Sequence, residues 1–193
     1  MKKFSGWAVV AVLAIIAVLV GGWFIGTRNS MVTLREDVEM QLSQVETTLQ
    51  RRSDLIPNLV STVQGYADHE QEVFTEIADA RSRLAGSVES GDIEAISEAN
   101  DELDSALSRL LAITENYPDL KASEQFTALQ DELAGTENRI NVARQYYNES
   151  VRTYNTTVQQ FPASIIAGMN GFYPLPYFEA DEGAEEVPEV SFN

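Results

Sequence analysis

The chain has 193 residues, with 30 Asp and Glu against 13 Lys and Arg, which gives a formal net charge of −17. This length suits one modest domain with an accessory segment. The acidic excess disfavours electrostatic binding of nucleic acid, because the phosphates would be repelled. The sequence contains no cysteine, which excludes disulfides, thiol catalysis and cysteine-ligated metals.

The first predicted element is a membrane anchor. The run from Trp7 to Ile25 carries no charge. At ~1.5 Å per residue it is just long enough to cross a hydrocarbon core of ~30 Å. Trp7 and Trp23 lie near its two ends, where indole rings favour the membrane interface. The run is longer than the apolar part of a cleaved signal peptide and no small-residue cleavage site follows it. We therefore predict an uncleaved signal-anchor at residues 7–26, after a short N-terminus at 1–6.

The flanking charges predict an orientation. Lys2 and Lys3 precede the apolar run, and Arg28 and Arg35 follow it. Together with the terminal amine, the two lysines favour a cytoplasmic N-terminus. We expect a single-pass protein of the cell (inner or plasma) membrane, with its main domain outside the cytoplasm.

Apolar residues then recur at steps of three and four, which predicts four helices. They cover about Ser30–Gln64, Asp68–Gly86, Asp92–Tyr117 and Ser123–Gln160. Short connections favour antiparallel neighbours. We therefore expect an all-α fold, an antiparallel up-down-up-down four-helix bundle over residues 30–161 with coiled-coil-like spacing. The first and last helices, at ~50 Å, would extend beyond the shorter middle pair at one end.

Local signals place the ends of these helices. Asp68 and Gln71 have the spacing of a capping box for the second helix. Gly86 is the expected end of that helix, followed by a loop to Asp92. Asp92 is the expected cap of the third helix, which Pro118 should end because the residue before a proline avoids the helical region.

The segment at residues 162–178 mixes apolar and aromatic side chains with glycine and proline, which disfavours a long helix. Two placements remain open for it. The segment could rest at the membrane interface, or it could fold back to cover the open end of the bundle. From 179 to 193 the chain is acidic and weakly apolar, which predicts a disordered tail.

Polar residues interrupt the apolar pattern of the first helix. Arg52 occupies the position that the spacing assigns to an apolar residue between Leu49 and Ile56. Pro57 should bend the helix and free the carbonyl group of Ser53. The last helix carries polar residues seven apart, which share one face. We predict either a partly buried polar layer or, alternatively, a stripe that faces water. The proposed layer comprises Arg51, Arg52, Asp54, Asn58, Glu137, Asn141, Arg144 and Asn148, with Arg52 paired to Glu137 and Arg144 paired to Asp54.

No catalytic apparatus is evident in the sequence. His69 is the only histidine, and His69-Glu70 lacks the second histidine of a zinc-protease helix. No nucleophile elbow and no phosphate-binding loop occur. We therefore expect no catalytic, cofactor-binding or metal-binding residue, and a protein that is not an enzyme.

Several motifs in order resemble the LemA family. They are Gln50-Arg51-Arg52-x-Asp54-Leu55-Ile56-Pro57-Asn58-Leu59-Val60, Gly65-Tyr66-Ala67-x-His69-Glu70, Ala80-Arg81, Glu115-Asn116-Tyr117-Pro118, Thr136-Glu137-Asn138, Ala143-Arg144-x-x-Tyr147-Asn148, Tyr154-Asn155, Phe161-Pro162 and Tyr177-Phe178. The resemblance implies a prokaryotic protein with one membrane helix, an α-helical bundle-like domain and no established enzymatic function. Some members of that family are associated with membrane remodelling in magnetosome organelles.

The expected function is therefore that of a non-enzymatic, membrane-anchored helical protein. It would act by self-association or by binding an unidentified protein partner at the surface of the lipid bilayer. The alternative is a structural protein that organises or remodels the membrane through ordered oligomers. A more distant alternative is an accessory subunit of a membrane protease or transporter. We expect no cofactor and no nucleic-acid partner.

Overall fold

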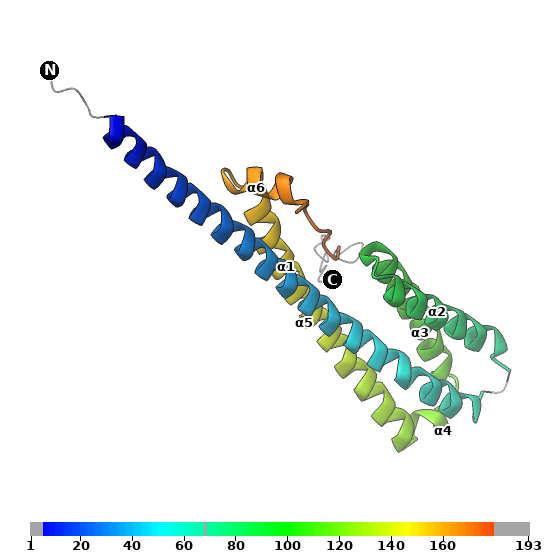
Figure 1. Ribbon diagram of the computed structural model, residues 1–193. Coiled ribbons are helices and arrows are strands. Elements are labelled where there is room, and N and C mark those ends of the chain that lie inside the picture. Colours follow the sequence, from blue (N-terminus) through cyan, green and yellow to red (C-terminus); the bar gives the residue numbers. More distant parts are fainter. Residues whose placement is uncertain (1–5, 68, 180–193) are drawn as a thin grey trace, which may run out of the picture. The chain divides into compact units, whose positions relative to one another are not determined.

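A computed structural model describes residues 6–67 and 69–179, and these residues contain helices and no strand. The all-α class is therefore confirmed. Asp68, Lys2, Lys3 and the tail after Glu179 lie outside the described residues. The helices are α1 (Gly6–Gln64), α2 (Gln71–Ser90), α3 (Ile93–Thr114), α4 (Pro118–Lys121), α5 (Glu124–Gln159) and α6 (Ala163–Asn170) (Figure 1).

The apolar run and the first expected bundle helix form one continuous helix. α1 has 59 residues and includes Gly26 and the polar residues that follow it. In the described part of the chain, α1 is the one helix that is long and apolar enough to cross a membrane. Its residues 6–20 are all exposed, so no other described residue covers the apolar run there.

α2 differs from the prediction at both ends. It begins at Gln71, and the side chain of the preceding Glu70 makes no capping hydrogen bond. The capping-box prediction is therefore wrong about where the helix begins. The predicted end at Gly86 is also wrong, because the helix continues to Ser90. It ends before Gly91, whose φ of 67° is the left-handed conformation that glycine adopts most readily.

The start of α3 agrees with the prediction. The Asp92 side chain accepts hydrogen bonds from the backbone N–H groups of Glu94 at 3.1 Å and Ala95 at 3.4 Å. These contacts satisfy two of the donors that a helix leaves unpaired at its N-terminus. α3 ends at Thr114, before the predicted Tyr117, and Pro118 begins the short helix α4.

The chain divides into two compact units, which we describe separately. The first unit comprises residues 1–41 and 149–175, and the second unit comprises residues 42–148 and 176–193. α1 and α5 each contribute to both units. The interior of the first unit contains Met31, Val38, Tyr154, Val158, Ile166 and Ala167.

The second unit has an apolar core drawn from α1, α2, α3 and α5. Its most buried members are Leu49, Ile56, Leu59, Ile77, Leu84, Ile96, Leu103, Leu110, Phe126 and Ile140. Burying each such aliphatic side chain contributes about 1.5–3 kcal/mol. On the rim, Arg83 pairs with Glu102 at 3.0 Å and Arg109 pairs with Glu76 at 2.9 Å. The later residue of α2 pairs with the earlier residue of α3, and the earlier with the later, which shows that α2 and α3 run antiparallel.

Candidate functional site

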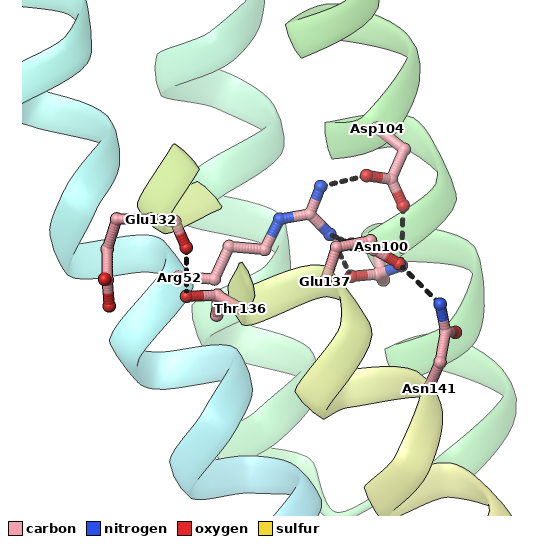
Figure 2. A network of polar contacts seen from close by, with 7 residues as sticks. All are labelled: Arg52, Asn100, Asp104, Glu132, Thr136, Glu137 and Asn141. Carbon is pink, nitrogen blue, oxygen red and sulfur yellow. Dashed lines mark hydrogen bonds and ion pairs between the residues drawn. The ribbon is translucent and has the colours of Figure 1, made fainter. Parts of the chain in front are cut away.

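A buried arginine lies at the centre of the polar residues in the second unit. Arg52 is only 5% exposed, although it is charged. It occupies a seam position of α1, which is a position that the three- and four-residue spacing assigns to an apolar side chain. Its Nη1 donates to Asn100 Oδ1 at 3.0 Å and lies 2.9 Å from Glu137 Oε2. Its Nη2 pairs with the carboxylate of Asp104. One side chain of α1 therefore binds polar groups of both α3 and α5 (Figure 2).

The groups around Arg52 are also bonded to one another. Asn100 Nδ2 donates to Asp104 Oδ2 at 2.9 Å, and Asn141 Nδ2 donates to Glu137 Oε1 at 3.4 Å (Figure 2). We call Arg52, Asn100, Asp104 and Glu137 the Arg52 cluster. A buried guanidinium is tolerated when opposite charges and hydrogen bonds replace its water. The two carboxylates of the cluster remain partly exposed.

The structure contains one of the two ion pairs expected from the sequence. Arg52 and Glu137 are paired, as described above. Asp54 instead accepts a hydrogen bond from Gln50 at 2.9 Å, one helical turn away on α1. Arg144 is buried, and its guanidinium carbon lies 5.3 Å from the centre of the Phe178 ring, a cation–π contact.

The other residues of the proposed layer are more exposed. Arg51 binds Glu132 through side chains that both reach solvent, a type of pair that contributes little to stability. Asn58 is exposed, and so is Asn141. The proposed polar layer is thus divided between buried groups and surface groups.

Sequence reasoning missed the α3 side of the Arg52 cluster. The signal was present, because Asn100 lies between Ile96 and Leu103 at the spacing of the apolar seam. Asn100 is 1% exposed, and Asp104 lies one turn further along α3. A buried polar contact between two helices requires a polar residue at a seam position of each helix.

A second polar contact involves the proline of α1. Pro57 has no backbone N–H, so the carbonyl group of Ser53 lacks its usual helical donor. Arg81 Nε of α2 lies 3.0 Å from that carbonyl oxygen and 3.1 Å from Ser53 Oγ. The side chain of α2 therefore satisfies the acceptor that Pro57 leaves, and ties α2 to α1. The bend predicted at Pro57 remains a prediction.

Two asparagines of α5 also bond backbone groups with their side chains, in this case those of the segment after α6. Asn155 donates to the backbone oxygen of Leu175 and accepts from its N–H, at 2.9 and 2.8 Å. Asn148 makes the same pair of bonds with Phe178, both at 2.9 Å. Residues outside helices and sheets leave such backbone groups unpaired unless another group bonds them. Residues 175 and 178 thus contact α5, and both placements of the segment stay predictions.

Tyr147 adds a third contact to this segment. Its hydroxyl donates to the backbone oxygen of Pro176 at 3.1 Å, and its ring meets Phe178 edge to face at 5.0 Å. Burial raises the pKa of Tyr147 to about 12. The hydroxyl is therefore protonated, and able to donate, throughout the physiological pH range.

A groove of about 380 Å³ opens beside the Arg52 cluster. Leu59, Leu107 and Leu133 supply apolar lining, and Asp131 adds a carboxylate to those of the cluster. The described residues contain no group of three or more His, Cys, Asp or Glu side chains arranged to hold a metal ion. Within the cluster the guanidinium of Arg52 is paired with two carboxylates, so the groove keeps an excess of negative charge.

Comparison with known proteins identifies the family. The model of the LemA family matches residues 41–192, which is most of the chain. The chain belongs to the LemA family. The matched range contains Arg52, Arg81, Asn148 and Asn155, so the contacts described above lie within the LemA-type region. The resemblance seen in the sequence motifs is thereby confirmed.

Curated relatives match most of the chain. Magnetosome protein MamQ 1 of Paramagnetospirillum magneticum is 27% identical over 95% of this chain and 74% of its own length. Magnetosome protein MamQ of Magnetospirillum gryphiswaldense is 27% identical over 84% of this chain and 68% of its own. Protein LemA of Metamycoplasma hominis is 24% identical over 82% and 72%. These relatives and the apolar α1 indicate a membrane-associated LemA protein.

The first prediction concerns the Arg52 cluster. Arg52→Leu should lower the free energy of unfolding by about 2–3 kcal/mol, because it leaves two carboxylates without their cation. Glu137→Leu should cost about 1 kcal/mol, since Asp104 still neutralises Arg52. The double variant should deviate from additivity by at least about 0.5 kcal/mol in thermal or denaturant melts followed by circular dichroism. Arg51→Leu, which removes an exposed pair, is the control. Purely additive losses would contradict the coupling.

The second prediction concerns Pro57 and Arg81. Arg81→Met should destabilise the protein by about 1–3 kcal/mol, because the buried Ser53 carbonyl loses its donor. In a Pro57→Ala background the helix can supply that donor itself, so Arg81→Met should cost measurably less. The same melts test both backgrounds. Equal costs in both would show that Arg81 acts elsewhere than at this carbonyl group.

Proposed function

We propose that this LemA protein is a non-enzymatic helical protein that acts at the membrane surface by self-association. In this proposal α1 is the anchor, and α1, α2, α3 and α5 form an up-down-up-down four-helix bundle. The antiparallel pairing of α2 with α3 and the links from Arg52 to α3 and α5 support this topology. Binding of a different protein partner is the main competing form of the same proposal.

The polar groups of the second unit support a structural role over a catalytic one. The guanidinium of Arg52 is already paired with Asp104, Asn100 and Glu137. A catalytic arginine or carboxylate must instead be available to a substrate when the substrate arrives. Polar groups that are bonded to one another in this way set the register of packed helices.

A surface groove between α1 and α5 carries the proposal of self-association. It has a volume of about 390 Å³ and lies in the second unit. Val142 and Tyr146 of α5 line it, and both are about half exposed. Its remaining lining consists of Gln44, Thr48, Asn138, Arg139 and Ala143.

The lining of this groove lacks the acidic side chains that would repel a second, equally acidic copy of the chain. None of its lining residues is acidic, in a protein whose net charge is −17. Arg139, which also lies 3.6 Å from a carboxylate oxygen of Glu132, offers a cation there, so an acidic side chain of a partner is favoured over a basic one. An anchor also confines all copies to one plane, which raises their effective concentration.

A structural role in organising membranes is the second candidate. Two of the relatives described above are named magnetosome proteins. A membrane-anchored protein that assembles through one surface could impose that assembly on the lipid. This candidate requires the same self-association, extended to ordered oligomers.

The size of the detergent-extracted, full-length particle tests self-association. We expect a particle larger than one copy, measured by light scattering. Val142→Glu with Tyr146→Glu should return it to a monomer, because two carboxylates would enter the interface. Tyr66→Glu, which alters an exposed aromatic outside the groove, is the matched control. A monomeric wild-type particle, or an oligomer indifferent to the groove variants, would contradict the proposal. Deformation of vesicles by the oligomer would favour the structural candidate.

We also propose that the N-terminus is cytoplasmic and that the main domain lies outside the cytoplasm. The lysines before the apolar run support this orientation. Alkaline phosphatase fused after Asn193 should be active, and a cytoplasm-dependent reporter at the same position should be inactive. The opposite pattern would reverse the orientation.

A further inference from the structure

α6 presents an unpartnered apolar face within the first unit. Ile165 and Met169, four residues apart, share one face of the helix and are 57% and 72% exposed. Phe161, just before the helix, is 83% exposed. The neighbouring Ile166 and Ala167 are buried. α6 is therefore held by one side, while large apolar groups on its other side are mostly left uncovered by the residues that the structure describes.

The contacts of α6 place it beside the point where α1 leaves the apolar run. Arg28 Nε donates to Asn170 Oδ1 at 3.1 Å, which joins the last residue of α6 to α1. Arg28 follows Ile25, the end of the apolar run, by ~4.5 Å along the helix axis. A group bonded to Arg28 therefore lies close to the level at which the run ends.

The exposure of α1 changes at this same level. Residues 6–20 are exposed all round the helix. Gly21, Phe24 and Thr27 are then half-buried, and Met31 is fully buried. These positions recur at steps of three and four, so they form one covered stripe. Protein thus begins to cover α1 within the last turns of the apolar run.

The charge distribution permits this region to meet lipid. No charged residue occurs between Arg152 and Glu179, although the chain as a whole is strongly acidic. Carboxylates would be repelled by anionic lipid headgroups and costly to bury among acyl chains. Tyr173, also exposed, adds an aromatic ring of the kind enriched at membrane interfaces.

We propose that α6 is an interfacial helix that lies on the membrane leaflet through which α1 emerges. Phe161, Ile165 and Met169 enter the boundary between headgroups and acyl chains, as the apolar face of an amphipathic helix does. The lipid bilayer is the occupant because the covalent anchor and the Arg28 contact hold this face at the level of the interface. α6 then provides a second attachment, which restrains the tilt and rotation of α1.

The absence of cysteine from the chain allows a direct test. Single variants Ile165→Cys and Met169→Cys of the full-length protein would each carry an NBD fluorophore. The protein would be reconstituted in phosphatidylcholine vesicles at low protein density, with and without lipids bearing a doxyl group near the headgroup. Both positions are already exposed, so the label disturbs no buried contact.

Two control positions give the quenching expected away from the membrane and inside it. Met40→Cys lies in the same unit and is 59% exposed, which matches Ile165. It follows Arg28 by ~18 Å along α1, away from the apolar run. Leu19→Cys, inside the run, should be quenched by lipids with a deeper doxyl group. We expect the shallow doxyl lipid to quench positions 165 and 169 several-fold more than position 40, with blue-shifted emission at both.

Quenching at positions 165 and 169 no stronger than at position 40 would overturn the proposal. So would a blue shift that grows with protein density while lipid quenching stays absent, because the face would then bind a second copy. Neither result depends on the groove between α1 and α5, since Val142 and Tyr146 remain unchanged in these variants.

Discussion

The buried guanidinium of Arg52 is the constraint on which the packing of the second unit depends. An arginine at a seam position of α1 is unfavourable unless neighbouring helices replace the water it has lost. α3 supplies Asn100 and Asp104, and α5 supplies Glu137. A slide of one turn along either helix would remove these acceptors while leaving apolar contacts largely interchangeable. The cluster therefore selects one register among several that the apolar core alone would tolerate.

Pro57 creates a second requirement of the same kind. It leaves one carbonyl group of α1 without a donor, and Arg81 of α2 supplies that donor. Each of the three other long helices of the second unit is thus tied to α1 by polar contacts: α2 through Ser53, and α3 and α5 through Arg52. The apolar core provides most of the stabilisation, whereas these contacts define which neighbours and which register are correct.

Periodicity made most of the helices predictable, because each helix buries one stripe of its surface. The cap at Asp92 was predictable as well, since capping depends on adjacent residues alone. The end of α2 was not, because both Gly86 and Gly91 can end a helix and only the backbone conformation decides between them. The α3 partners of Arg52 are distant in sequence. The apolar spacing around Asn100 indicates that this residue is buried, but which helix it meets depends on tertiary packing.

The asparagines of α5 show a spacing whose meaning needs the structure. Asn148 and Asn155 are seven apart, which indicates a shared face, and the natural expectation is a partner on another helix. Their partners are instead the backbone groups of Leu175 and Phe178. An amide side chain can donate and accept at once, and so it replaces the neighbouring strand that this extended segment lacks. Because amides rather than charges perform this task, the chain from Arg152 to Glu179 can satisfy its backbone and still remain uncharged. That combination suits the interfacial placement that we propose for α6.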